Sequence, residues 1–188
     1  MSQGGQAVLS IILGLALWTG AHVLKRIAPD VRARMGDKGK AVVGIVTALG
    51  VVLMIAGYRG AEYIELWPKV QALVGINNLL MLFALYLYAA SGMKTAITRK
   101  IRHPQLTAVK VWAVAHLLVN GDLASVVLFG GLLGWAVVEV ILINRADRNW
   151  VRPAVQPMSR EVMAVVGALV VTAIVMAVHT WLGVQPFG

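Results

Sequence analysis

The chain has 188 residues, of which 59% are hydrophobic and 13% are charged, about half the charged share of an ordinary soluble domain. This composition excludes a soluble globular domain and indicates a membrane protein. The net charge is +9, but the basic residues lie between apolar segments, which argues against nucleic-acid binding and makes the lipid bilayer the expected partner. The absence of cysteine excludes disulfides, thiolate ligands and covalent c-type haem.

Five apolar stretches reach the roughly 20 residues needed to cross about 30 Å of hydrocarbon: residues 5–24, 41–58, 70–92, 123–144 and 162–183. A sixth stretch, 105–119, is shorter. The opening MSQGGQ lacks the basic region of a secretory signal, so we expect the first stretch to remain in the mature protein. The sequence predicts an all-α fold, an integral membrane bundle of about six transmembrane helices that forms a single domain over residues 1–188.

The Lys and Arg residues of the connecting loops predict the orientation of these helices. Residues 25–40 contain six of them, and residues 93–104 and 145–161 contain four each, whereas 58–69 contain two and 119–123 none. This alternation requires the sixth stretch to cross the membrane. We therefore expect both termini outside and the three basic loops in the cytoplasm.

Two local patterns predict how the helices meet. Small residues at helical spacing, Gly44 with Ala48 and Gly130 with Gly134, would allow close helix contact. The Asn-Gly-Asp sequence at 120–122 predicts a tight turn, in which the glycine permits positive φ and the aspartate caps the following helix.

Ionisable side chains at membrane depth are rare and usually face a partner or a cavity. Lys110 and Glu139 each lie six residues, or roughly 9 Å, inside the cytoplasmic ends of consecutive helices. We expect them to form an ion pair, either as a structural clamp or as part of a proton or substrate site.

Two histidines stand in matching surroundings. In WTGAH, Trp18 precedes His22 by four residues, and in WAVAH, Trp112 precedes His116 by four, so each pair shares a helix face. Two buried imidazoles beside aromatic walls are what a flat cofactor with an axial metal needs. The alternative is that the histidines hydrogen-bond across helices while the tryptophans pack.

Further polar residues extend these faces. Arg26 lies four residues after His22, and Asn120 lies four after His116. Arg102 and His103 precede Pro104, which marks a helix start at the membrane surface. These two residues either contact lipid headgroups or hold a carboxylate or phosphate of a cofactor.

A family resemblance rests on the segment RHPQLTAVKVWAVAHLLVNGDLASVVLFGGLLGWAVVE, together with a histidine late in the first apolar stretch and the basic RIAPDVRARMG loop after it. The chain resembles the NnrU family of bacterial membrane proteins, which is related to the plant and cyanobacterial 15-cis-zeta-carotene isomerases. The resemblance implies a non-covalent haem b held by two histidines, which by position are His22 and His116. His103 is the alternative ligand.

In the picture that the resemblance implies, Trp18 and Trp112 flank the porphyrin, Arg26 or Arg102 meets its propionates, and Asn120 faces the same interior. The implied function is cis–trans isomerisation of an apolar polyene such as a zeta-carotene-like carotenoid, or a part in nitric oxide and nitrite metabolism. The alternative is a non-enzymatic membrane protein that senses haem or nitric oxide, or passes it to a respiratory assembly.

Overall fold

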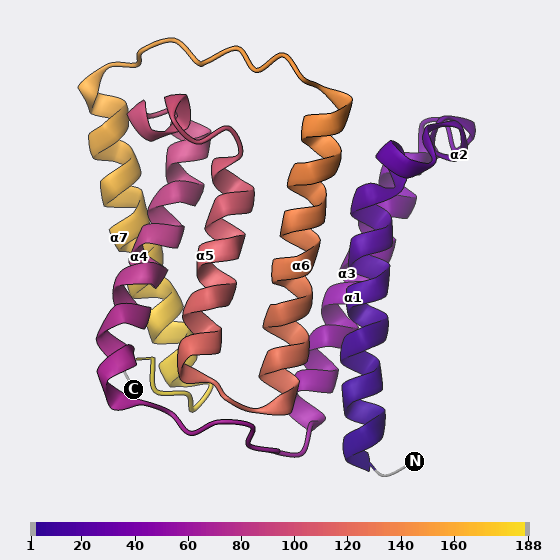
Figure 1. Ribbon diagram of the computed structural model, residues 1–188, viewed down its shortest axis with the longest axis vertical. Helices are drawn as coiled ribbons and strands as arrows, with labels where there is room; N and C mark the ends of the chain where they lie inside the picture. Colours follow the sequence, from indigo (N-terminus) through magenta and orange to yellow (C-terminus); the bar gives the residue numbers. More distant parts are fainter. Residues whose placement is uncertain (1–2, 187–188) are drawn as a thin grey trace. The chain divides into compact units, whose positions relative to one another are not determined.

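A computed structural model describes residues 3–186 as an arrangement of helices (Figure 1). In chain order the elements are α1 (Gln3–Ile27), α2 (Pro29–Arg34), α3 (Lys38–Gly60), α4 (Gln71–Met93), the 3₁₀ helix η1 (Ala96–Arg99), α5 (Pro104–Val119), α6 (Leu123–Ala146) and α7 (Met158–Trp181). Within residues 3–186 the strand-like pairing consists of an isolated antiparallel bridge between Glu65 and Asp122. The predicted all-α fold is confirmed.

Five helices have the length needed to cross a bilayer. α1, α3, α4, α6 and α7 contain 23 to 25 residues each, or about 35 Å at 1.5 Å per residue, and they coincide with the five long predicted stretches. α5 is the shorter apolar helix, with 16 residues. Large apolar side chains such as Ile45 and Leu79 are 68% and 70% exposed, which suits hydrocarbon rather than water. These are the features of an integral membrane protein.

The helices belong to two compact units, each built from two segments of the chain. Unit 1 comprises Met1–Pro68 and Asn120–Arg148 and contains α1, α2, α3 and α6. Unit 2 comprises Lys69–Val119 and Asn149–Gly188 and contains α4, η1, α5 and α7. The single domain expected over residues 1–188 stays a prediction.

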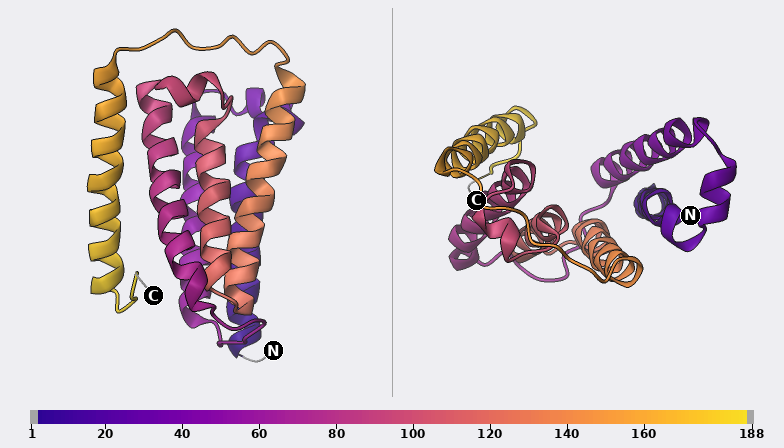
Figure 2. Two further views of the ribbon diagram at one scale, coloured as in Figure 1. Left: turned by 60° about the vertical axis from the view of Figure 1, so that its left-hand side comes forward. Right: turned by 90° about the horizontal axis from the view of Figure 1, so that it is seen from above.

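In unit 1, α1 packs against both α3 and α6 (Figure 2). Glycines bring α1 and α3 together: a Cβ at Gly57 would lie 2.6 Å from the carbonyl oxygen of Ala7, and a Cβ at Gly14 would lie 2.6 Å from that of Gly50. No side chain fits at these distances, so α1 and α3 meet backbone to backbone, as small residues permit in membrane helices.

The small residues chosen from the sequence do not make this contact. Within unit 1, no atom of another element lies within 4 Å of a Cβ built at Gly44, Gly130 or Gly134. The prediction of close approach at these glycines is wrong. A four-residue spacing marks positions on one helix face, but the packing partner decides which face is used.

The turn at residues 120–122 is held against the loop that follows α3. The N–H groups of Leu66 and Trp67 donate to the carbonyl of Gly121 at 2.7 and 3.1 Å. Asp122 caps α6 as predicted, because its Oδ1 accepts from the Ser125 N–H at 2.9 Å. Gly121 does not have the predicted positive φ; it is required because a Cβ there would collide with the Trp67 carbonyl.

In unit 2, α4 lies between α5 and α7 and packs against both (Figure 2). The Tyr86 hydroxyl on α4 donates to Glu161 Oε1 on α7 at 2.9 Å. α4 is capped by Lys94, which has a left-handed φ of 54° and donates its N–H to the Ala90 carbonyl. After η1, α5 begins at Pro104, the position that the sequence predicts for its start.

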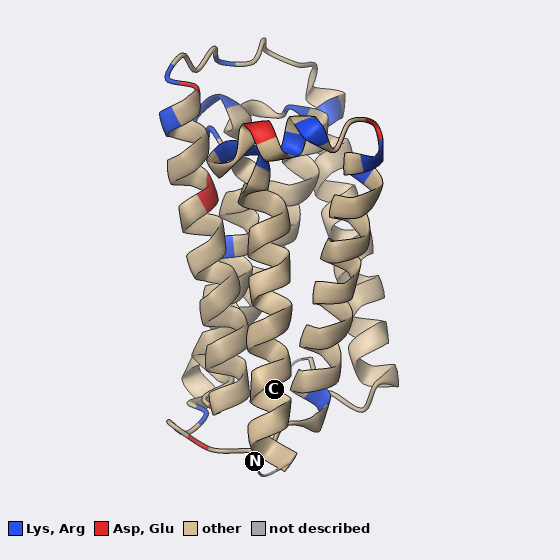
Figure 3. Ribbon diagram, turned by 90° about the vertical axis from the view of Figure 1, so that its right-hand side faces the viewer, with Lys and Arg blue, Asp and Glu red and all other residues tan. Residues whose placement is uncertain are grey.

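Basic residues gather at one end of each unit (Figure 3). In unit 1 they occupy the end of α1, α2, the start of α3 and the end of α6: Lys25, Arg26, Arg32, Arg34, Lys38, Lys40, Arg145 and Arg148. In unit 2 they lie between α4 and α5 and before or at the start of α7: Lys94, Arg99, Lys100, Arg102, Arg152 and Arg160. Each unit therefore has one strongly basic end.

Candidate functional site

The C-terminal half of α1 presents Trp18, His22 and Arg26 at intervals of one helical turn. His22 Nδ1 lies 2.8 Å from the carbonyl oxygen of Trp18, and the two rings pack with centroids 4.3 Å apart. Because a carbonyl oxygen only accepts hydrogen bonds, Nδ1 is the donor, and in a neutral imidazole of this tautomer Nε2 keeps its lone pair. Metal-binding histidines commonly have this arrangement.

α6 completes the surroundings of His22 with Trp135. The Trp135 ring meets the His22 ring edge-on at 5.0 Å and the Trp18 ring edge-on at 5.2 Å. Trp135 is buried. The imidazole therefore packs against two tryptophans from different helices, and these tryptophans also contact each other.

One turn beyond Trp135, Glu139 Oε2 forms an ion pair with Arg26 Nη1 at 3.3 Å. Glu139 is 4% exposed, so the ion pair offsets the loss of hydration around its carboxylate. The partner that the structure gives Glu139 is thus Arg26 of the same unit, and the predicted ion pair with Lys110, a residue of unit 2, stays a prediction. We call Trp18, His22, Arg26, Trp135 and Glu139 the α1–α6 cluster.

Three buried polar atoms of the α1–α6 cluster have no hydrogen-bond partner among the described residues: Trp18 Nε1, Trp135 Nε1 and Glu139 Oε1. Buried donors and acceptors are nearly always paired, since each unpaired group costs free energy. Two indole donors and one carboxylate acceptor within one cluster therefore form an unusual concentration of unmet polar groups. These groups can form hydrogen bonds with a bound molecule that carries polar substituents.

His116 has a similar local arrangement in unit 2. Its Nδ1 lies 3.0 Å from the carbonyl oxygen of Trp112, and the ring centroids are 5.0 Å apart. The imidazole is partly buried. His179 on α7 makes the same type of bond, at 2.8 Å to Val175. All three histidines therefore make the same bond from Nδ1 to the backbone. His22 and His116 share, in addition, a ring contact with the tryptophan one turn before.

The other candidate residues lie at the ends of α5. Arg102 and His103 immediately precede α5 in unit 2, and Arg102 lines a pocket there. Asn120 follows the last residue of α5 and belongs to unit 1. Their part in holding a cofactor stays a prediction. Within residues 3–186, no group of three or more His, Asp or Glu side chains is arranged to hold a metal ion.

A family model described as NnrU protein matches residues 10–186, nearly the whole chain. The chain belongs to the NnrU family. No curated protein and no solved structure matches it. The matched range includes both tryptophan–histidine pairs and the whole α1–α6 cluster of this NnrU protein.

Sequence reasoning missed the contribution of α6 to the cluster. Trp135 and Glu139 are four residues apart and share a helix face, which repeats the spacing of Trp18 and His22. This spacing was a usable signal. The sequence contains no comparable signal for the packing of α6 against α1, because the two helices are remote in the chain.

Proposed function

We propose that this NnrU protein binds a non-covalent haem b through His22 and His116. The observation that carries the proposal is the imidazole of His22, with Nδ1 bonded to the Trp18 carbonyl and Nε2 left for a ligand. His116 has the same bond and the same type of aromatic neighbour. Neutral imidazoles of this tautomer suit the axial positions of haem iron.

The residues of the α1–α6 cluster fit such a group. Trp18 and Trp135 supply flat apolar surface, and their unpaired indole N–H groups, with Glu139 Oε1, supply polar contacts. In this proposal the Trp18 carbonyl orients His22, and the tryptophans exclude water from its Nε2. Arg26 forms an ion pair with Glu139 beside them. When bound, haem supplies an iron that can change oxidation state and bind a small molecule.

The function that we propose follows from family membership and this residue set. The protein is an integral membrane haem protein that acts on an apolar polyene by cis–trans isomerisation or takes part in nitric oxide and nitrite metabolism. Helices immersed in lipid give an apolar substrate direct access from the bilayer. Both termini lie outside and the basic loops face the cytoplasm, because positively charged loops are retained on that side.

The test is an absorption spectrum of the detergent-purified protein, produced with haem available, before and after reduction by dithionite. We expect a sharp Soret band and split visible bands on reduction, lost in His22→Ala and in His116→Ala. His179→Ala is the matched control, since His179 makes the same backbone bond without a tryptophan ring contact among the described residues. Equal haem content in all three variants would exclude the assignment.

If haem binding is established, the purified protein is assayed with a cis-polyene and with nitric oxide under anaerobic conditions. Turnover that requires both histidines supports an enzyme. A haem protein without turnover that crosslinks to a respiratory partner would support the sensing or transfer role instead.

A further inference from the structure

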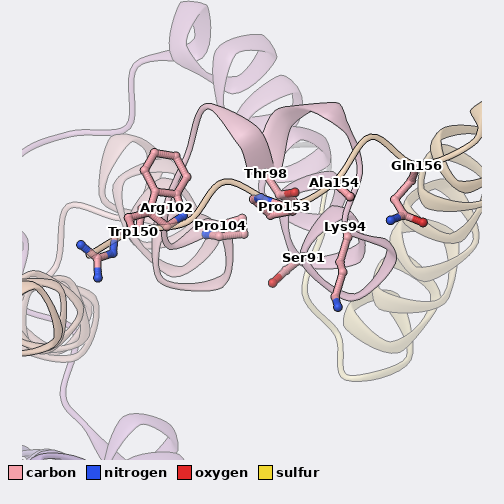
Figure 4. Close-up of a pocket in the computed structure, with 9 residues that line it drawn as sticks. All are labelled: Ser91, Lys94, Thr98, Arg102, Pro104, Trp150, Pro153, Ala154 and Gln156. Carbon is pink, nitrogen blue, oxygen red and sulfur yellow. The ribbon is translucent and has the colours of Figure 1, made fainter. Parts of the chain in front are cut away.

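Unit 2 contains a pocket at its basic end, whose lining includes neither Trp112 nor His116. Its volume is about 410 Å³, within the range of small-ligand sites. Figure 4 shows the segment before α7 crossing over the connection between α4 and α5, with Lys94 at one end of the pocket and Arg102 at the other. The pocket lies at the helix ends, where the headgroups of a bilayer begin.

We propose that this pocket binds the phosphate-bearing headgroup of an anionic phospholipid. Two cations line it, Lys94 and Arg102, and Ser91 and Gln156 add a hydroxyl and an amide donor. No carboxylate is among the lining residues. A phosphate diester needs this combination of positive charge and hydrogen-bond donors.

The charge of the surrounding unit favours the same ligand. Glu161 is the only acidic residue in the sequence of unit 2, and it already accepts a hydrogen bond from Tyr86 at 2.9 Å. Lys100, Arg152 and Arg160 belong to the basic end of the same unit. The sequence of unit 2 is therefore strongly basic, and its electrostatic field attracts anions.

The backbone at Lys94 provides a second, independent observation. Its φ of 54° is the only left-handed value of a non-glycine residue within residues 3–186. A helix C-terminus of this kind usually has glycine, which adopts the conformation without steric cost. A lysine adopts this conformation here in spite of that cost, and it lines the pocket.

The apolar part of the lining favours a lipid over free phosphate. Trp150, Pro104 and Pro153 contribute to the wall, and the ring of Trp150 also lies 5.9 Å from the Arg152 guanidinium. Tryptophan is favoured at the interface between headgroups and acyl chains. The pocket is also much larger than one phosphate ion, so a glycerophosphate headgroup with the start of its chains fills it better.

The experiment measures retention of phosphatidylglycerol and of phosphatidylcholine with matched acyl chains, by native mass spectrometry of the delipidated full-length protein. We expect preferential retention of phosphatidylglycerol. Lys94→Gly and Arg102→Gln should each weaken it about fivefold, the usual effect of one cation near anionic lipid. Glycine accepts the φ of residue 94, so Lys94→Gly removes the charge without straining the helix end.

Lys100→Gln is the matched control, because Lys100 carries the same charge at the same end of unit 2 but does not line the pocket. It should change retention by less than twofold. Equal retention of the two lipids, or an equal loss in Lys100→Gln, would overturn the proposal. Displacement of phosphatidylglycerol by millimolar inorganic phosphate would assign the pocket to free phosphate and would also overturn it.

Discussion

Arg26 Nη1 lies 3.3 Å from Glu139 Oε2, so an ion pair joins α1 to α6 although the two residues are far apart in the chain. The side chain of Glu139 is 5% exposed and that of Arg26 is 19% exposed. Removing charges from water is costly, and the pair compensates for this cost only while both partners remain. The ion pair thus selects α1 as the neighbour of this face of α6.

We expect Glu139→Ala to destabilise the protein by about 3 kcal/mol, because Arg26 is left without its carboxylate. The double variant Arg26→Met with Glu139→Leu should lose less, since neither charge remains to be paired. Denaturation of the detergent-solubilised variants, followed by circular dichroism, measures both. A double variant less stable than Glu139→Ala would contradict this account of the pair.

Close packing of α1 and α3 predicts different effects for two glycines on the same helix. Gly57→Ala places a methyl group 2.6 Å from the Ala7 carbonyl oxygen and 2.8 Å from the Ile11 nitrogen, which should cost about 1–3 kcal/mol. Gly44→Ala meets no atom within 4 Å and should be neutral or stabilising, because alanine favours the helix. Thermal unfolding in detergent distinguishes them, and equal melting temperatures would argue against the α1–α3 contact.

The cap of α6 predicts a graded effect at residue 122. Asp122→Ala removes the acceptor for the Ser125 N–H and for the Ser125 hydroxyl, so we expect a loss of about 1–2 kcal/mol. Asp122→Asn retains an oxygen acceptor and should lose less. Chemical denaturation of the two variants tests the order, and a larger loss in Asp122→Asn would show that charge rather than capping dominates.

The proposed orientation is open to a labelling test because the chain contains no cysteine. Glu62→Cys and Lys100→Cys place single thiols at exposed positions in loops on either side of α4. In intact spheroplasts a membrane-impermeant maleimide should label Glu62→Cys, and it should label Lys100→Cys only after permeabilisation. The opposite pattern would reverse the orientation, and labelling of both would show that they share one side.

The sequence was sufficient for features that depend on neighbouring residues. The length of each apolar stretch predicts a membrane helix, because unpaired backbone groups are unfavourable in hydrocarbon, and the corresponding helices are present. Pro104 begins α5 and Asp122 caps α6, as local backbone chemistry predicts. The contact of each candidate histidine with the tryptophan one turn before it follows from helical periodicity in the same way.

Only the tertiary structure decided which faces meet. It paired Glu139 with Arg26, brought Trp135 against His22, and joined α1 to α3 through Gly14, Gly50 and Gly57. Apolar periodicity carries little information about such choices, because a helix surrounded by lipid is apolar on every side and gains little hydrophobic free energy by choosing one neighbour over another. Shape complementarity and the pairing of buried charges select the partner, and both depend on residues that are distant in the chain.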